Sequence, residues 1–386
     1  MARCIVCGSS SCHEIVRTPE LPVLTNRLAD TAAEARAVPR AALDLVHCAE
    51  CQHIFNADFD ASLLDYAEGY ENALHFSPHF RGYLDQLVDR LIDSYPLAGK
   101  RAVEIGCGDG FFLDVLRRRA DMVCLGYDPS VPTVARSQEH TDAAIEILTE
   151  TLAAGRCSPS AELVCARHVL EHVDDPVAFL KSALACLSGP EAAAYIEVPN
   201  GEHIIRGRRI WDVIYEHVSY FSARSLACAI ASAGGAVLES GCAFDRQFLW
   251  VDAGLKPPHS NSRTDTLAEA DIRGFAGSFS DMIGHWGARL DHLISAGRRI
   301  VMWGAGSKGI SFLNLVGAGA PVPDYIVDLN SRKTGKFVAG GGQAVVPPEF
   351  LKQYRPDIVI IMNATYRAEI AAILDRLGLD CDIITV

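Results

Sequence analysis

Four cysteines occur as two closely spaced pairs, Cys4 with Cys7 and Cys48 with Cys51. Two residues between cysteines allow one tight turn to direct both sulfur atoms at the same ion, and two such turns complete a tetrahedral ligand set. C-x-x-C motifs also perform redox chemistry, but two copies without catalytic surroundings favour metal binding. We therefore expect one zinc ion with a structural role, because four thiolates leave it no open coordination position.

A glycine-rich turn marks a second chemical site. Residues 101–110 read RAVEIGCGDG, so Glu104 ends a predicted strand and Gly106, Gly108 and Gly110 form the turn before an apolar helix. Glycines allow the backbone to turn sharply and to approach a ligand where a side chain would clash. The first turn of the following helix offers free N–H groups. On its own, such a loop is also compatible with NAD or FAD.

An acid at the end of the next strand narrows this choice. Residues 125–128 read LGYD, which places Asp128 where its carboxylate can accept hydrogen bonds from both hydroxyls of a ribose. Pro129 beside it supports an alternative in which Asp128 only caps a turn. The spacing G-x-G-x-G, together with Glu104 at the strand end, separates the loop from the G-x-G-x-x-G pattern of dinucleotide sites.

These motifs, together with the later segment RHVLEHVDDP, resemble the class I S-adenosylmethionine-dependent methyltransferases. The resemblance implies a Rossmann-like α/β domain whose glycine loop lies under the methionine part of the donor, with Asp128 on the ribose. It also implies that Glu150, at the end of the strand IEILTE, lies beside the adenine. His168 and His172 follow the fourth strand, at the carboxyl edge where such sheets bind ligands. We expect His168 near the donor and His172 near the reacting groups.

Over essentially the whole chain, the cysteine pairs, the methyltransferase core and a C-terminal α/β unit resemble the zinc-containing C-methyltransferases of nucleotide-diphosphate keto-deoxysugars. The most specific local match is YEHVSYF at residues 215–221. The resemblance implies that His217 is the general base and that Tyr215 and Glu216 orient it or the substrate. Carbon methylation needs such a base, because a proton beside a ketone must leave first. An alternative in which His217 only packs between a loop and a helix stays open.

The segment ahead of this core departs from that family. The family has a serine-rich stretch near a substrate-contacting tyrosine, whereas this chain reads DYAEGYENALHFSPHF. Tyr70 is the expected counterpart of the tyrosine. The departure leaves the acceptor open. We expect an anionic or nucleotide-linked small molecule, and O- or N-methylation on the same scaffold is the alternative.

A second glycine loop lies near the C-terminus. Residues 298–309 read RRIVMWGAGSKG, and Asp328 ends the next strand, so the spacing alone is compatible with NAD. A bifunctional protein with an NAD-binding C-terminal domain is therefore a further alternative. The segment SKGISFLN resembles the C-terminal domain of the sugar C-methyltransferases, which implies a role in binding the nucleotide and phosphates of the substrate. The expected substrate-binding residues lie in this loop and the following helix: Gly304, Gly306, Ser307, Lys308 and Asn314.

The surrounding sequence divides into three regions that must position these residues. Residues 1–75 carry the cysteine pairs and form a zinc-binding module. Residues 76–258 alternate apolar strands with helical stretches, as in a parallel α/β sheet, and form the donor-binding domain. The polar segment KPPHSNSRT at residues 256–264 predicts a linker, and residues 259–386 form a second Rossmann-like α/β domain that binds substrate.

Bulk composition limits the partners. The formal net charge of −13 argues against a nucleic-acid partner, because phosphate backbones need a basic surface. No apolar stretch approaches the roughly 20 residues that span a bilayer. The N-terminus lacks a signal-peptide pattern, so we expect a cytoplasmic enzyme without membrane contacts. The cysteines in apolar segments, Cys124, Cys165, Cys186 and Cys228, are expected to be free thiols. The sequence does not predict an oligomeric state.

Overall fold

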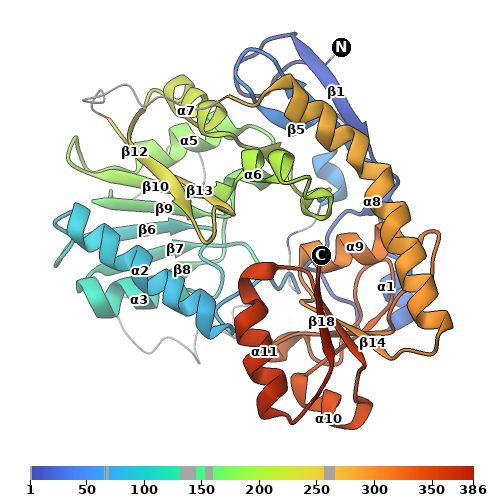
Figure 1. Ribbon diagram of the computed structural model, residues 1–386. Coiled ribbons are helices and arrows are strands. Elements are labelled where there is room, and N and C mark those ends of the chain that lie inside the picture. Colours follow the sequence, from blue (N-terminus) through green and yellow to red (C-terminus); the bar gives the residue numbers. More distant parts are fainter. Residues whose placement is uncertain (1, 65, 67–68, 131–144, 153–159, 256–265) are drawn as a thin grey trace.

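Figure 1 shows the computed structural model, which describes residues 2–64, 66, 69–130, 145–152, 160–255 and 266–386. The predicted linker at residues 256–264 lies outside these described residues. None of the helices in the described part of the chain combines the length and the apolar composition needed to cross a membrane.

The N-terminal region is a small β structure. Its main sheet has the order β1-β4-β5-β11 with antiparallel pairing. The fourth strand, β11, comes from the middle of the chain and pairs Ser219 with Phe55 and Tyr220 with Ile54. A short second sheet pairs β2 with β3. The elements are β1 (Cys12–Arg17), β2 (Leu21–Pro22), α1 (Ala32–Arg36), β3 (Arg40–Ala41), β4 (Asp44–Cys48), β5 (Ile54–Asn56), η1 (Ala61–Leu63) and β11 (Ser219–Tyr220).

The middle region contains a seven-stranded sheet of order β12-β13-β10-β9-β6-β7-β8. All the strands are parallel except β13, which runs antiparallel to both neighbours. This arrangement confirms the predicted Rossmann-like methyltransferase core. The strands are β6 (Arg101–Ile105), β7 (Val123–Tyr127), β8 (Ile145–Leu148), β9 (Leu163–Arg167), β10 (Ala193–Pro199), β12 (Ala236–Ala243) and β13 (Phe248–Gly254).

Helices and short 3-10 turns connect these strands and cover the sheet. Helix α2 begins after Ser77, whose hydroxyl accepts a hydrogen bond from the Phe80 N–H, and Pro78 supplies the first residue. Its buried residues Leu84, Val88 and Leu91 recur at helical spacing. The elements are α2 (Pro78–Ser94), α3 (Phe111–Ala120), η2 (Leu170–His172), α5 (Pro176–Ala185), α6 (Gly201–Arg206), η3 (Ile210–Asp212) and α7 (Ala223–Ser232).

The C-terminal region is a second α/β unit, as predicted. Its five strands are all parallel, in the order β16-β15-β14-β17-β18. The long helix α8 contacts β1 and α9, and in Figure 1 it runs along the N-terminal and C-terminal regions. The elements are α8 (Glu269–Ser295), β14 (Ile300–Trp303), α9 (Ser307–Gly317), β15 (Tyr325–Val327), η4 (Ser331–Lys333), β16 (Ala344–Val346), η5 (Pro348–Phe350), α10 (Leu351–Tyr354), β17 (Ile358–Ile361), η6 (Ala364–Tyr366), α11 (Arg367–Arg376) and β18 (Asp382–Thr385).

One hydrophobic core joins all three regions. It includes Leu43 from the N-terminal sheet, Trp211 from the middle region and Met302 from β14, together with Phe279 of α8. Burial of this shared apolar surface fixes the regions against one another. The sites between them therefore have defined walls.

One sequence expectation about the cysteines is wrong. Cys124, Cys165 and Cys228 are not disulfide-bonded, but Cys186 is. The sequence around a cysteine in an apolar segment is the same whether or not the fold brings a second sulfur atom to it. The surroundings of a cysteine along the chain therefore do not show whether it is bonded.

Candidate active site between the three regions

The two cysteine pairs meet in the N-terminal region. Cys4 Sγ lies 3.5 Å from Cys51 Sγ and Cys7 Sγ lies 3.6 Å from Cys48 Sγ, and all four sulfur atoms lie within 4.8 Å of one another. A tetrahedral zinc ion with bonds of about 2.3 Å needs sulfur atoms roughly 3.8 Å apart. The four thiolates therefore have the spacing of a closed metal site, as the pairing in the sequence predicts.

This cysteine cluster also supports the segment that contains His217. Cys48 ends β4 and Cys51 lies in the turn before β5. Strand β5 pairs with β11, which begins two residues after His217. The Asn56 N–H donates a hydrogen bond to the Val218 carbonyl at 2.9 Å. The position of His217 thus depends on the sheet that the cysteine cluster holds together.

The larger cavity, of about 640 Å³, lies at the carboxyl end of the middle sheet. Such a cavity is large enough for a nucleoside-sized ligand. Eight of the predicted residues line it: Tyr70, Glu104, Gly106, Gly108, Asp128, Glu150, His168 and His172. Gly110 lies just outside, where its φ of +82° begins helix α3.

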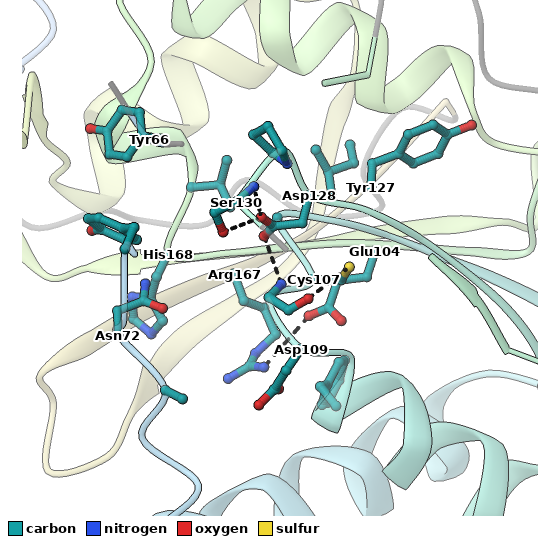
Figure 2. A pocket seen from close by; sticks show the side chains of 18 of the residues that line it. Tyr66, Asn72, Glu104, Cys107, Asp109, Tyr127, Asp128, Ser130, Arg167 and His168 are labelled. Atoms are coloured by element: carbon teal, nitrogen blue, oxygen red, sulfur yellow. Dashed lines mark hydrogen bonds and ion pairs between the residues drawn. The ribbon is translucent and has the colours of Figure 1, made fainter. Parts of the chain in front are cut away.

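Asp128 organises the glycine loop of this cavity. Its Oδ2 accepts a hydrogen bond from the Gly108 N–H at 2.7 Å, and its Oδ1 accepts from the N–H and hydroxyl of Ser130 (Figure 2). Gly106 has a φ of +73°, and a Cβ there would lie 2.2 Å from Val169. Only glycine fits that position. Asp128 therefore caps this turn, and its role on the ribose stays a prediction.

Buried charges form the floor of the cavity. Arg167 lies 3.8 Å from Glu104 and 3.3 Å from Glu197, and Figure 2 shows the first of these ion pairs. Burial raises the pKa of Glu104 to about 8 despite Arg167. Burial opposes ionisation of Glu197 as well, but Arg167 and His168 outweigh it and lower its pKa to about 2. Arg167 thus keeps one carboxylate charged and leaves the other protonated near neutral pH.

His168 belongs to the same network. Its Nε2 lies 3.3 Å from Glu197 and its Nδ1 lies 3.5 Å from Glu171. Burial alone would lower the pKa of His168, but the two carboxylates outweigh it and raise the pKa to about 9. The imidazole is therefore a cation at neutral pH. It holds the strand end by ion pairs and is unsuited to accept a proton.

A second cavity, of about 290 Å³, lies between the middle and C-terminal regions. Five predicted residues line it: His217, Gly304, Gly306, Ser307 and Lys308. The C-terminal glycine loop is folded like the first one, because Asp328 Oδ2 accepts a hydrogen bond from the Ala305 N–H at 2.8 Å. A Cβ on Gly309 would lie 2.3 Å from the Gly304 carbonyl oxygen, so the loop and helix α9 approach as closely as glycine permits.

The predicted phosphate contacts already have protein partners. Lys308 Nζ lies 2.8 Å from Asp212 Oδ1 and donates to Gln247 Oε1 at 3.0 Å. Ser307 Oγ accepts a hydrogen bond from Asn26 Nδ2 at 2.9 Å. An anionic ligand would have to share Lys308 with Asp212. The ammonium group nevertheless lies at the wall of the cavity, where it can act over a short distance.

The two cavities adjoin at a pair of histidines. His172 lines the larger cavity and His217 lines the smaller, and their ring centroids lie 4.8 Å apart. Ala73 and Leu74 line both cavities. Burial and the neighbouring His172 lower the pKa of His217 to about 3, so its imidazole is neutral at physiological pH. A molecule in each cavity would meet at this junction.

The carboxylate of Glu216 supports Tyr70, whereas the sequence suggests that it orients His217 or the substrate. Its carboxylate accepts hydrogen bonds from the Thr25 N–H at 3.0 Å, from the Thr25 hydroxyl and from the Tyr70 hydroxyl at 2.8 Å. Burial, and next the charge of Glu216, raises the pKa of Tyr70 well above its usual range. Glu216 thus fixes Tyr70 as a neutral hydroxyl, and His217 points away toward His172.

Two further predicted site residues lie outside both cavities. The Tyr215 hydroxyl accepts a hydrogen bond from the Asp60 N–H at 3.1 Å, and its ring packs on Phe59. Asn314 accepts from Arg40 at 2.9 Å and donates to the carbonyls of Ile310 and Ala339. Both side chains hold neighbouring segments together, because their backbone positions direct them away from the ligand spaces.

Sequence reasoning did not single out several residues that shape the site. Arg167 and Glu197 are strand-end residues that only the sheet brings together. Arg332, from the C-terminal region, reaches Asp109 of the first glycine loop at 2.9 Å. Gln247 bonds to Lys308 across the second cavity. Charged residues at the ends of apolar strands were the available signal, since ligands bind at those ends.

Residues 77–240 match a family model described as a methyltransferase domain, and residues 263–378 match one described as a C-methyltransferase C-terminal domain. The chain is 25% identical to C-methyltransferase NovU of Streptomyces niveus over an aligned length of 397 residues, which covers 95% of this chain and 90% of that protein. A ubiquinone biosynthesis O-methyltransferase of Rhodopseudomonas palustris (strain BisA53) is 30% identical over 119 residues, 29% of this chain and 47% of the relative. A solved S-adenosylmethionine-dependent methyltransferase from Mesorhizobium loti has 19% identity and a TM-score of 0.36, covering 44% of this chain and 99% of that one.

Proposed function

We propose that this chain, an S-adenosylmethionine-dependent methyltransferase with a C-methyltransferase C-terminal domain, methylates a carbon atom beside a ketone. The acceptor in this proposal is a nucleotide-linked keto-deoxysugar or a similar small anionic metabolite. One observation carries the proposal: a second cavity with Lys308 at its wall adjoins the donor cavity at His172 and His217.

The donor occupies the larger cavity in this proposal. Asp128 accepts hydrogen bonds from the ribose hydroxyls, Glu150 lies beside the adenine, and the loop from Gly106 to Gly110 lies under the methionine part. Glu104 faces the same cavity. Its protonated carboxyl can donate a hydrogen bond to the carboxylate of the methionine part.

The acceptor occupies the smaller cavity, and His217 takes its α-proton. The C–H electron pair then forms the enolate, whose carbon attacks the donor methyl group, and the S–CH3 bond breaks to leave the neutral thioether. A base with a pKa of about 3 is too weak for this step near neutral pH. An anionic acceptor beside His217 raises that pKa, because negative charge favours the imidazolium form. The base is therefore strengthened when the acceptor is bound.

Tyr70 and Glu216 complete the proposed site. The Tyr70 hydroxyl donates to Glu216, and Tyr70 lines the donor cavity. We assign Tyr70 to positioning of the reacting groups and Glu216 to positioning of Tyr70. Tyr215 supports the segment from behind through Asp60.

We further propose that the ion of the four-cysteine site is zinc, since four thiolates at tetrahedral spacing suit Zn²⁺. Cys4, Cys7, Cys48 and Cys51 would hold it. Its role would be to stabilise the sheet that carries β11.

A proton-exchange experiment distinguishes methylation of carbon from methylation of oxygen or nitrogen. With a keto-sugar nucleotide in deuterated water, the wild-type enzyme should move deuterium into the α-position even without the methyl donor. His217→Ala should lose both exchange and methylation by about 10²–10⁴-fold. Donor affinity should stay near that of wild type, since the donor contacts lie elsewhere.

Asp128→Ala is the matched control, for which we expect weaker donor binding and unchanged deuterium exchange. Full turnover by His217→Ala would contradict the proposal. O-methylation would then be the better function, which the similarity of part of the chain to O-methyltransferases also supports. A hydroxyl acceptor needs less help from a base, because aligned oxygen attacks the sulfonium directly.

A further inference from the structure

Three side chains converge at the junction of the two cavities: Glu171, His172 and His217. Glu171 and His172 lie on the 3-10 helix η2 after β9, and His217 lies just before β11. One carboxylate oxygen and one ring nitrogen from each histidine all lie within 4.8 Å of one another. The three residues come from two distant parts of the chain, and the contact between η2 and β11 brings them together.

Two polar atoms of this group have no protein partner. Glu171 is 1% exposed, and its Oε2 has no hydrogen-bond partner among the described residues. Within the same described ranges, the buried Nδ1 of His217 also lacks one. Buried polar atoms in folded proteins are almost always satisfied. Two such atoms in one group, whose ligand atoms lie within 4.8 Å of one another, indicate a ligand that the protein itself does not supply.

The remaining atoms are held as metal ligands usually are. Glu171 Oε1 lies 3.5 Å from Nδ1 of His168. His172 Nδ1 lies 3.0 Å from the Glu216 carbonyl oxygen and 3.1 Å from the Tyr66 hydroxyl. Since a carbonyl only accepts hydrogen bonds, Nδ1 of His172 carries the proton and Nε2 keeps its lone pair. Such an outer hydrogen bond fixes the tautomer and ring orientation of a histidine ligand.

We propose that Glu171, His172 and His217 bind a divalent first-row transition-metal ion at the junction of the donor and acceptor cavities. Two imidazoles and one carboxylate form a ligand set that suits zinc, iron and cobalt ions. Three protein ligands leave at least one coordination position open. His172 and His217 each line one cavity, so this position lies where an acceptor oxygen can reach it.

A bound ion fixes the distances between its ligand atoms. Ligand atoms in a loaded tetrahedral site lie about 3.4 Å apart, given bonds of about 2.1 Å. The ligand atoms here lie within 4.8 Å of one another, so the difference from this spacing is at most about 1.4 Å. Rotation of the half-buried His172 and His217 rings into the junction can close this difference. The site is separate from the four-cysteine cluster, which has soft thiolate ligands only.

This inference does not rest on the proposed function, but the ion and the α-proton would compete for the same lone pair of His217. A neutral imidazole has one lone pair, so His217 cannot bind the ion and accept a proton in the same molecule. Added ion should therefore slow deuterium exchange if His217 is the base. Faster exchange with the ion bound would contradict the base assignment and support the metal site as part of the reaction.

Cobalt is a suitable probe, because it absorbs visible light and reports its ligands. Full-length protein with zinc in the four-cysteine site is titrated with Co²⁺, without methyl donor or acceptor. We expect one equivalent to bind, with a d–d absorption typical of nitrogen and oxygen ligands and without thiolate-to-cobalt charge transfer. Calorimetry on the same samples gives the affinity.

Variants then locate the ion. Glu171→Gln keeps the shape of the side chain, and Glu171 lies outside both cavities, so donor binding should confirm that the variant is folded. We expect Glu171→Gln and His217→Gln each to weaken Co²⁺ binding by about 100-fold or more. His203→Gln is the matched control, since His203 lines the smaller cavity but lies outside the group of three. No binding by wild type, or equal binding by Glu171→Gln, would overturn the proposal.

Discussion

At the scale of single residues, Asp128 combines an observed role in the glycine loop with a proposed role in donor binding. Its carboxylate holds the Gly108 N–H and Ser130 in the structure, and we propose that it also accepts the ribose hydroxyls of the donor. These roles are compatible, because a carboxylate has about four acceptor positions. The same side chain can therefore shape the loop before the ligand binds and contact the ligand afterwards.

Asp128→Ala should weaken S-adenosylmethionine binding by one to two powers of ten, on the order of 1.5–3 kcal/mol for lost charge-assisted hydrogen bonds. Calorimetric titration measures this directly. The exposed Asp121, which pairs with Arg117, offers a control: Asp121→Ala should bind like wild type. Wild-type affinity in Asp128→Ala would mean that the residue only caps the turn.

His168 makes stability depend on pH on the alkaline side. Its folded-state pKa of about 9 exceeds the ordinary 6.5, because Glu171 and Glu197 outweigh burial. The stabilisation is therefore fully present below pH 6.5 and is lost as pH rises to about 9, on the order of 3 kcal/mol. Glu104 acts in the same direction between its ordinary pKa of 4.5 and about 8, since the folded state binds the extra proton.

Thermal unfolding midpoints of the unliganded protein should therefore fall between pH 6.5 and pH 9. His168→Gln should be less stable than wild type at pH 6.5, and its midpoint should fall less steeply. The difference between the two proteins isolates His168 from Glu104. Parallel curves for both proteins would show that the ion pairs of His168 contribute no pH-dependent stability.

At the scale of elements, β11 links the N-terminal sheet to His217, the proposed base. It pairs with β5 of the N-terminal sheet and begins two residues after His217. Cys48→Ser should release the metal and loosen this sheet, because a closed four-thiolate site stabilises a module with little core of its own. Methylation should fall sharply, whereas donor affinity should change little, since the donor cavity lies on the middle sheet.

Metal analysis and donor titration on the same preparation check this prediction. Cys12→Ser is the matched control: Cys12 pairs in β-register with Cys48 but lies outside the cluster of four. It should keep both the metal and the activity. Full activity in metal-free Cys48→Ser would mean that β11 holds His217 without the cluster.

At the scale of the whole molecule, the C-terminal region docks on the middle region and closes the smaller cavity, the proposed acceptor site. Ser77 Oγ donates to Glu369 Oε2 at 2.7 Å, and the His79 N–H donates to the same oxygen at 3.0 Å. Gln247 donates to Thr365 at 2.6 Å. These contacts lie at the walls of the smaller cavity and determine its shape.

Glu369→Ala removes two of these hydrogen bonds. Together they stabilise the docking of the C-terminal region by about 1–1.5 kcal/mol. We expect the KM for the acceptor to rise by about fivefold to tenfold, with donor affinity unchanged. Steady-state kinetics at saturating donor measures the effect. Asp375→Ala, an exposed acid on the same helix α11, serves as control. Equal kinetics for both variants would contradict a role of docking in acceptor binding.

The sequence by itself determined the features that depend on short segments. We could identify these motifs because each spans only a few neighbouring residues: two C-x-x-C pairs, two glycine loops and the acids Asp128 and Asp328. The alternation of apolar strands and helices likewise indicated both α/β sheets. Such features depend on local backbone geometry and on local hydrophobic patterns, and both are determined by residues that are close together in the sequence.

Only the tertiary structure decided which side chains meet. Glu216 precedes His217 in the chain, yet it bonds to Tyr70 and Thr25, and His217 faces His172. The physical reason is that successive side chains point in different directions, set by backbone angles and by pairing with β5. Contacts between residues far apart in sequence carry no local signal. The sequence therefore identified the chemical groups of the site, whereas the packing of the three regions determined which of these groups contact one another.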